Sequence, residues 1–172
     1  YRMTDGQEAA NITFANVEAE AVIGSPDQGY PLMASVVEDA RVAVCANALG
    51  ALESLNAQTL EYCKTREQFG VAIGSFQALQ HRLVDMFGAC ENVKSLLYRA
   101  VCAVQDGSED ARRSVLALKV MVGRAGKHIG GEAIQLHGGM GMTDELSVGF
   151  FVKRLMIINT LFGDADYHQQ LF

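Results

Sequence analysis

Apolar residues recur every three or four positions along most of this chain, which is the spacing of amphipathic helices. Four segments keep this spacing and predict helices at about 31–64, 76–104, 109–136 and 145–161, with a last amphipathic turn or helix after Gly163. Long antiparallel helices joined by short loops predict an all-α fold, an up-and-down four-helix bundle, over residues 29–172.

The same spacing predicts which side of each helix faces the core. The third helix would use Val115, Leu118, Val122, Ala125 and Ile129. The second helix would use the apolar residues Leu79, Leu83, Phe87, Cys90, Val93, Leu97, Val101 and Val104. Helices this long usually bury faces on both sides of a bundle or pack against another subunit.

The first 28 residues follow a different pattern. Ile12, Phe14 and Val17 alternate with polar neighbours, which predicts a strand within residues 11–22, and turn-forming residues follow at Gly24 and Pro26. A lone strand is not stable without companions. We therefore interpret residues 1–28 as a short N-terminal β remnant and linker, at which the chain begins inside a truncated β domain.

Composition narrows the class of partner. The chain of 172 residues has 14 Lys and Arg against 20 Asp and Glu, a formal net charge of -6, which argues against nonspecific binding to nucleic acid or to a membrane surface. No apolar run approaches the roughly 18 residues of a membrane span, and nothing at the start resembles a signal peptide, so a cytoplasmic protein is expected. Its cysteines lack a CxxC pair, which favours reduced core thiols and predicts no zinc or other metal site; they are Cys45, Cys63, Cys90 and Cys102.

Two loops combine residue types that suit an anionic ligand. The sequence TREQFGVAIGSFQ places Arg66, Phe69 and Gln77 in one connection, although Arg66 alone could be a solvated loop arginine. The sequence QLHGGMGMTDE contains glycines that could end a helix, since glycine tolerates the left-handed conformation. The same glycines could also bring backbone N–H groups up to a phosphate.

These motifs, with GSFQALQHRLVDM and QLHGGMGMTDELSVGFFVKR in that order, resemble the C-terminal helical domain of the acyl-CoA dehydrogenase family. The opening residues resemble the end of that family's middle β domain. The resemblance implies an FAD-dependent oxidation of an acyl-CoA to a 2-enoyl-CoA, with an electron-transfer flavoprotein as the electron acceptor.

The resemblance also implies which residues bind FAD. Arg66, Phe69 and Gln77 would contact FAD held mainly by a neighbouring subunit of a homodimer or homotetramer. A second segment would touch the same FAD, and it consists of Gln135, Leu136, His137, Gly138 and Gly139. For His137 the alternative is a local hydrogen bond only.

The family's substrate motif, D-x-x-R, corresponds here to Glu38 and Arg41, for which the alternative is a helix-surface ion pair. The catalytic base is missing from both positions at which the family carries it, because these hold Phe162 and Ala40. The variant FGDADYH is closer to bacterial subfamilies, including steroid-degrading ones, than to the common fatty-acid enzymes.

Three explanations of the missing base remain open. A shifted loop could bring in Asp164 or Asp166, which could equally be the N-cap and a first-turn acid of the last helix. Asp39 could serve after a different rotation of the first helix. Alternatively, the chain belongs to a noncatalytic or half-site subunit of a hetero-oligomer whose partner supplies the base.

Overall fold

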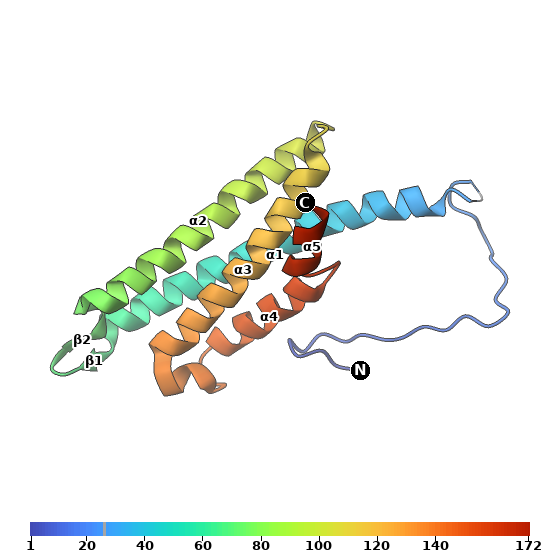
Figure 1. Ribbon diagram of the computed structural model, residues 1–172. Coiled ribbons are helices and arrows are strands. Elements are labelled where there is room, and N and C mark those ends of the chain that lie inside the picture. Colours follow the sequence, from blue (N-terminus) through green and yellow to red (C-terminus); the bar gives the residue numbers. More distant parts are fainter. Residues whose placement is uncertain (26) are drawn as a thin grey trace.

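The computed structural model describes residues 1–25 and 27–172 and shows long helices packed side by side, with an extended N-terminal segment to one side of them (Figure 1). Pro26, part of the predicted turn, lies outside the described residues. The helices are α1 (Gly29–Thr65), α2 (Gln77–Gln105), α3 (Ala111–His137), α4 (Val148–Thr160) and α5 (Ala165–Leu171). The predicted all-α four-helix bundle is therefore confirmed, with α5 as the short last helix.

Short irregular pieces connect these helices. Between α1 and α2 the chain forms a small antiparallel hairpin, β1 (Glu67–Gln68) and β2 (Val71–Ala72), followed by the 3-10 turn η1 (Ile73–Ser75). A second 3-10 turn, η2 (Gly138–Met142), follows α3. Helix α3 stops where Gly138 takes the left-handed φ of +58°, so the predicted glycine helix stop is confirmed.

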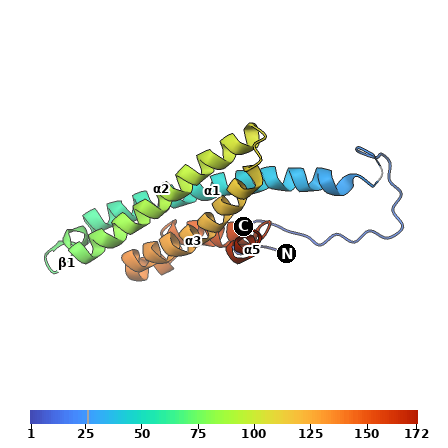
Figure 2. The same ribbon diagram turned by 45° about the horizontal axis from the view of Figure 1, so that its top comes forward.

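Helix α3 occupies the middle of the molecule and contacts each of the other four helices. Figure 2 shows it lying between α1 and α2 on one side and α5 on the other. All the α3 residues predicted to face the core are buried. Leu118 and Ile129 are fully buried, and burial of such side chains contributes on the order of 2 kcal/mol each.

The predicted core face of α2 is partly wrong. Phe87 and Val101 are 62% and 41% exposed, whereas Met86 and Ala100 are fully buried. The buried stripe runs through Met86, Cys90, Val93, Leu97 and Ala100. Phe87 and Val101 lie one position later, on a second apolar face that the described residues leave uncovered.

The strand predicted within residues 11–22 does not form. These residues run as extended backbone without ladder hydrogen bonds, and Ile12 and Phe14 are 74% and 76% exposed. In residues 1–25 the β pairing is limited to one bridge between Arg2 and Glu8. A strand needs a neighbouring strand to bind its N–H and C=O groups, and the described part of this chain supplies none beside residues 11–22.

A small turn at the N-terminus nevertheless docks on the helices. Arg154 of α4 donates from Nη1 to Asp5 Oδ2 at 2.8 Å and to Gln7 Oε1 at 2.9 Å, and its Nε donates to Asn47 Oδ1 of α1 at 2.9 Å. Residues 10–25 swing away from the bundle between this turn and α1 (Figure 1).

Three cysteines are core residues, as predicted, but Cys102 is exposed near the end of α2, so the prediction is wrong there. All four are free thiols. Within the described residues, no helix combines the length and apolar character that crossing a membrane requires.

Candidate functional site

The predicted site residues form two groups at different points along α1. One group surrounds Arg41, and the other lies beyond the C-terminal end of α1, around Arg66. The rise of an α-helix places these two arginines about 35 Å apart. A single chain therefore presents two separate partial sites.

Arg41 joins α1 to the turn after α4. Its Nη1 donates to Glu38 Oε1 at 2.7 Å, and its Nε donates to the carbonyl oxygen of Phe162 at 3.3 Å. The ion pair predicted from the i, i+3 spacing is therefore present. The second oxygen of the Glu38 carboxylate, Oε2, is buried and has no hydrogen-bond partner among the described residues. Such an acceptor can receive a donor from a bound molecule.

A groove of about 540 Å³ opens beside this ion pair. Its walls come from the first half of α1, the start of α3, and α5, and they include Tyr30, Val37, Glu38, Arg41, Arg112 and Tyr167. The groove therefore combines two guanidinium groups and a carboxylate with apolar surface. This chemistry suits a ligand that has both polar or anionic groups and an apolar part.

The turn after α4 has an unusual backbone. Phe162 and Gly163 have φ values of +58° and +99°, which is the left-handed region that side chains rarely adopt. A Cβ atom at Gly163 would come within 2.5 Å of Tyr167 Cδ1, so only glycine fits there. His168 Nε2 donates to the carbonyl oxygen of Phe162 at 3.0 Å, which fixes the protonated ring nitrogen because a carbonyl can only accept.

The three candidate bases lie outside the walls of this groove. Asp164 is the N-cap of α5, since its Oδ1 accepts a hydrogen bond from the Tyr167 N–H at 2.8 Å. Asp166 is an exposed acid in the first turn of α5, and Asp39 is exposed on α1. The N-cap interpretation of Asp164 and the first-turn interpretation of Asp166 are therefore confirmed as their structural roles.

Sequence reasoning missed two fully buried residues near this turn, Lys119 and His168. Lys119 Nζ donates to the carbonyl oxygens of Ile158, Asn159 and Gly163. Burial is the largest cause that lowers the pKa of His168 below its usual value of 6.5, and the charges of Arg41 and Lys119 lower it further. The signal for Lys119 was a charged residue next to Leu118 in the apolar stripe of α3.

The second group begins at Arg66, the C-cap of α1. Its carbonyl oxygen accepts the Ile73 N–H at 2.8 Å, which closes the hairpin and leaves the guanidinium group exposed. Phe69 at the hairpin tip is 93% exposed, and its ring meets that of Phe76 edge to face at 6.2 Å. Gln77 is the first residue of α2, where the backbone N–H groups have no helical partners. The hairpin thus offers a cation, an aromatic face and a helix N-terminus.

The end of α3 packs against the last turn of α1, just before this hairpin. The Tyr62 and His137 rings are 4.4 Å apart, and Tyr62 donates its hydroxyl to the carbonyl oxygen of His137 at 3.4 Å. His137 is buried and its Nδ1 donates to the carbonyl oxygen of Ala133 at 2.8 Å, so the predicted alternative, a local hydrogen bond, is present.

The five residues of this segment differ in accessibility. Leu136 and His137 turn into the core, whereas Gln135, Gly138 and Gly139 are exposed. A Cβ atom at Gly139 would meet nothing within 4 Å, so the packing of this chain does not require glycine there.

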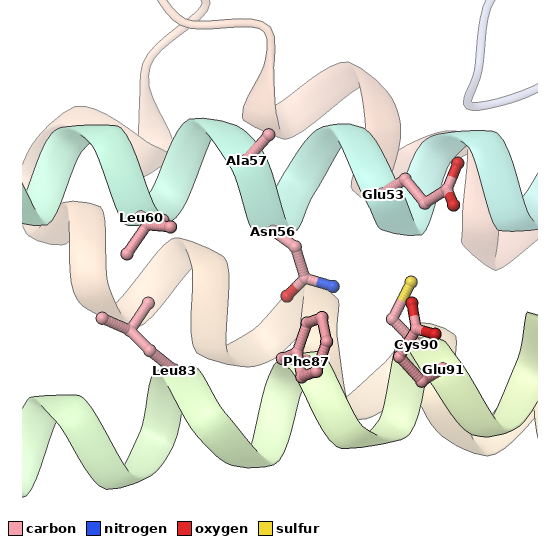
Figure 3. Close-up of a pocket in the computed structure, with 8 residues that line it drawn as sticks. All are labelled: Glu53, Asn56, Ala57, Leu60, Leu83, Phe87, Cys90 and Glu91. Carbon is pink, nitrogen blue, oxygen red and sulfur yellow. The ribbon is translucent and has the colours of Figure 1, made fainter.

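A further groove of about 350 Å³ lies between α1 and α2, away from all the predicted site residues (Figure 3). Leu60, Leu83 and Phe87 make its walls largely apolar, with Asn56 and Cys90 between them. Phe87 belongs to the uncovered second face of α2.

Comparison with known proteins gives consistent matches over most of the chain. Residues 27–171 match the family described as "Acyl-CoA dehydrogenase, C-terminal domain". A short-chain specific acyl-CoA dehydrogenase of Megasphaera elsdenii is 32% identical over 150 residues, which are 87% of this chain and 39% of that protein.

Two solved structures are also similar. "PigA with FAD and proline" has a TM-score of 0.74 and 31% identity over 78% of this chain and 35% of that chain. The "Tcur3481-Tcur3483 steroid ACAD G363A variant" has a TM-score of 0.87 and 30% identity over 99% of this chain and 45% of that chain. The present chain thus spans less than half the length of these relatives.

Proposed function

This chain belongs to the acyl-CoA dehydrogenase family, whose C-terminal domain it matches, and we propose that it forms the C-terminal part of an FAD-dependent acyl-CoA dehydrogenase. The parent enzyme would oxidise an acyl-CoA thioester to the 2-enoyl-CoA. The observation that carries this proposal is the placement of Arg66, Phe69, the α2 N-terminus and the α3 glycine segment together at one end of the bundle.

This end of the bundle fits a phosphate-bearing dinucleotide. Arg66 would bind a phosphate with its guanidinium group. Gln77 would contact FAD at the N-terminus of α2, where the first backbone N–H groups are free to bind a phosphate. Gly139 leaves open space in which FAD could approach the backbone closely. Phe69 offers an exposed ring for stacking. When bound, FAD would supply the acceptor for the hydride that leaves the acyl chain.

The groove at Arg41 is the proposed substrate site. Glu38 Oε2 is a buried acceptor that has no partner among the residues the structure describes, and a donor on the CoA ester would satisfy it. Arg41 already holds Glu38 and the Phe162 carbonyl oxygen, so its role is to orient these groups. We propose a fatty or steroidal acyl group, since the names of two relatives describe a short-chain specific and a steroid enzyme.

The roughly 35 Å between Arg41 and Arg66 supports an FAD shared between subunits, because one chain does not bring its two partial sites together. A homodimer or homotetramer would place Arg66 of one chain near the Arg41 groove of another. The free thiols of this chain suit a reducing compartment, so we propose that the parent is cytoplasmic. We propose an electron-transfer flavoprotein as its electron acceptor.

A second candidate is a noncatalytic or half-site subunit in a hetero-oligomer. The observation that favours it is Phe162, which stands on the strained turn where the family carries its base, while Asp164 is engaged as an N-cap. In that case a partner chain supplies the carboxylate that removes the α-proton. Asp39 and Asp166 remain as candidates within this chain.

The test is an anaerobic titration of the full-length parent with a panel of acyl-CoA thioesters, followed in the visible flavin spectrum. Bleaching by the protein alone would support the enzyme with its own base, and Asp39→Asn, Asp164→Asn and Asp166→Asn would then identify that base. A bound flavin that stays oxidised in the parent but bleaches in the Phe162→Glu variant would support the half-site subunit.

A matched pair of variants tests the flavin site itself. Arg66→Ala should lower the flavin content at least about tenfold, since it removes a charged contact to a phosphate. Lys64→Ala, two residues away, removes an exposed cation that pairs only loosely with Glu61 at 3.5 Å and should leave the flavin content unchanged. A parent that binds no flavin under any reconstitution would contradict the proposal.

A further inference from the structure

Lys119 of α3 is fully buried, yet it carries a charged group bound to backbone alone in the described structure. Its Nζ donates to the carbonyl oxygens of Ile158 and Asn159 at 2.9 Å and of Gly163 at 2.7 Å. An ammonium group has three N–H donors, so all are used. No salt bridge links Lys119 to a carboxylate within the described residues.

Filling space does not explain this arrangement. A methionine would occupy a similar volume without the cost of burying a charge. It would, however, leave three carbonyl oxygens without a donor. Two of them, from Ile158 and Asn159, lie at the end of α4, where helical carbonyl oxygens lack partners and the helix dipole favours a cation.

The third carbonyl oxygen belongs to the strained turn. Phe162 and Gly163 are both left-handed, and such a backbone persists only where its surroundings hold it. The Phe162 carbonyl oxygen is bound by Arg41 of α1 and His168 of α5, and the next carbonyl oxygen, of Gly163, is bound by Lys119 of α3. Three helices thus hold two consecutive peptide groups.

We propose that Lys119 is a positioning residue, which holds the turn at residues 161–164 and thereby sets where residue 162 and Asp164 lie relative to Arg41. The inference rests on the proposed function only in treating the Arg41 groove as the substrate site. Lys119 is not among the residues that line the groove, so it acts through the Gly163 carbonyl oxygen. Any side chain at position 162 is then presented from the same fixed backbone.

The test measures motion at position 162 in the full-length parent and needs neither flavin nor substrate. A nitroxide is attached to Phe162→Cys in a Cys102→Ser background, since Phe162 is 40% exposed and Cys102 is the exposed native thiol. The EPR spectrum is compared with and without Lys119→Met. We expect the label's rotational correlation time to shorten about threefold or more, because the turn loses its α3 contact.

Two controls separate positioning from general loosening. Lys127→Met removes an exposed lysine two turns further along α3 and should leave the spectrum at position 162 unchanged. A label on native Cys102, on α2, which supplies none of the side chains that bind the turn's carbonyl oxygens at Phe162 and Gly163, should respond to neither lysine variant. A spectrum at 162 that Lys119→Met does not alter would overturn the proposal, and so would equal loosening at 102.

If Lys119→Met does not fold, Lys119→Gln takes its place. A glutamine keeps an amide donor but cannot serve three carbonyl oxygens, so an intermediate spectrum at position 162 is expected. An unchanged spectrum would again count against the proposal. Because no step depends on flavin, a negative result would leave the proposed function standing, and a protein without flavin would leave this inference testable.

Discussion

His168 makes the stability of the molecule depend on pH. Its ring is fully buried, and burial holds its pKa below the value of 6.5 that it regains on unfolding. As the pH falls below 6.5, His168 is protonated in the unfolded chain but stays neutral in the folded chain until the pH reaches its lowered pKa. The contribution of His168 is therefore fully present above pH 6.5 and is lost as the pH falls from 6.5 through the lowered pKa of the folded state.

We predict that the free energy of unfolding decreases by up to about 1.4 kcal/mol per pH unit below pH 6.5 on account of this residue. Urea unfolding at closely spaced pH values measures it. His168→Gln should flatten the profile in that range, whereas His128→Gln, an exposed histidine of α3, should keep it. Equal profiles for the native protein and His168→Gln would show that His168 does not cause the dependence.

The sequence predicts local contacts of single residues better than distant ones. The Arg41–Glu38 pair follows from helical spacing, and the Asp164 N-cap follows from its place before α5. The contacts of Lys119 and His168 with the Phe162 turn depend on how α3 and α5 pack against the end of α4. No local sequence pattern encodes that packing. The one sequence signal for it is a charged residue, Lys119, within the apolar stripe of α3.

Helix α1 divides into an uncovered half and a buried half. Tyr30, Met33 and Val36 are 84%, 64% and 58% exposed, because this end extends beyond the bundle (Figure 1). Leu52 and Leu55, further along, are fully buried. The same helix therefore contains apolar residues that stabilise the fold and others left free for ligands or subunits.

We predict that Leu52→Ala lowers the free energy of unfolding by about 2–5 kcal/mol, since it leaves a cavity in the hydrophobic core. Met33→Ala should change it by less than about 0.5 kcal/mol, because it removes exposed surface only. Urea unfolding of both variants at one pH provides the measurement. Similar losses would mean that something in the protein covers the first half of α1.

The sequence predicts whole helices well where the apolar periodicity extends over many residues. The helices begin and end within about three residues of the sequence prediction, as expected for strongly periodic segments. The face of α2 was less certain, since Phe87 and Met86 are both apolar and only packing decides which is inside. The strand predicted at 11–22 does not form because a strand needs neighbouring strands, and residues 1–25 and 27–172 bring none to it.

At the scale of the whole molecule, the uncovered face of α2 indicates assembly. Val84, Phe87, Tyr98 and Val101 are 65%, 62%, 65% and 41% exposed, and their spacing places them along one side of the helix. The apolar groove between α1 and α2 opens on the same side, at Phe87 (Figure 3). Apolar surface of this extent on a folded domain usually marks a contact between proteins, and a second copy of the chain suits the shared flavin site.

We predict that Phe87→Glu in the parent lowers the molar mass of the oligomer by the mass of at least one subunit. Light scattering after size-exclusion chromatography measures this mass. The introduced charge would have to be buried without a partner at the contact. Asn92→Glu adds the same charge to α2 at an exposed position outside this set of apolar residues and should leave the mass unchanged. If Phe87→Glu retains the native mass, the subunits meet through another surface, and the exposed first half of α1 becomes the next face to test in the same way.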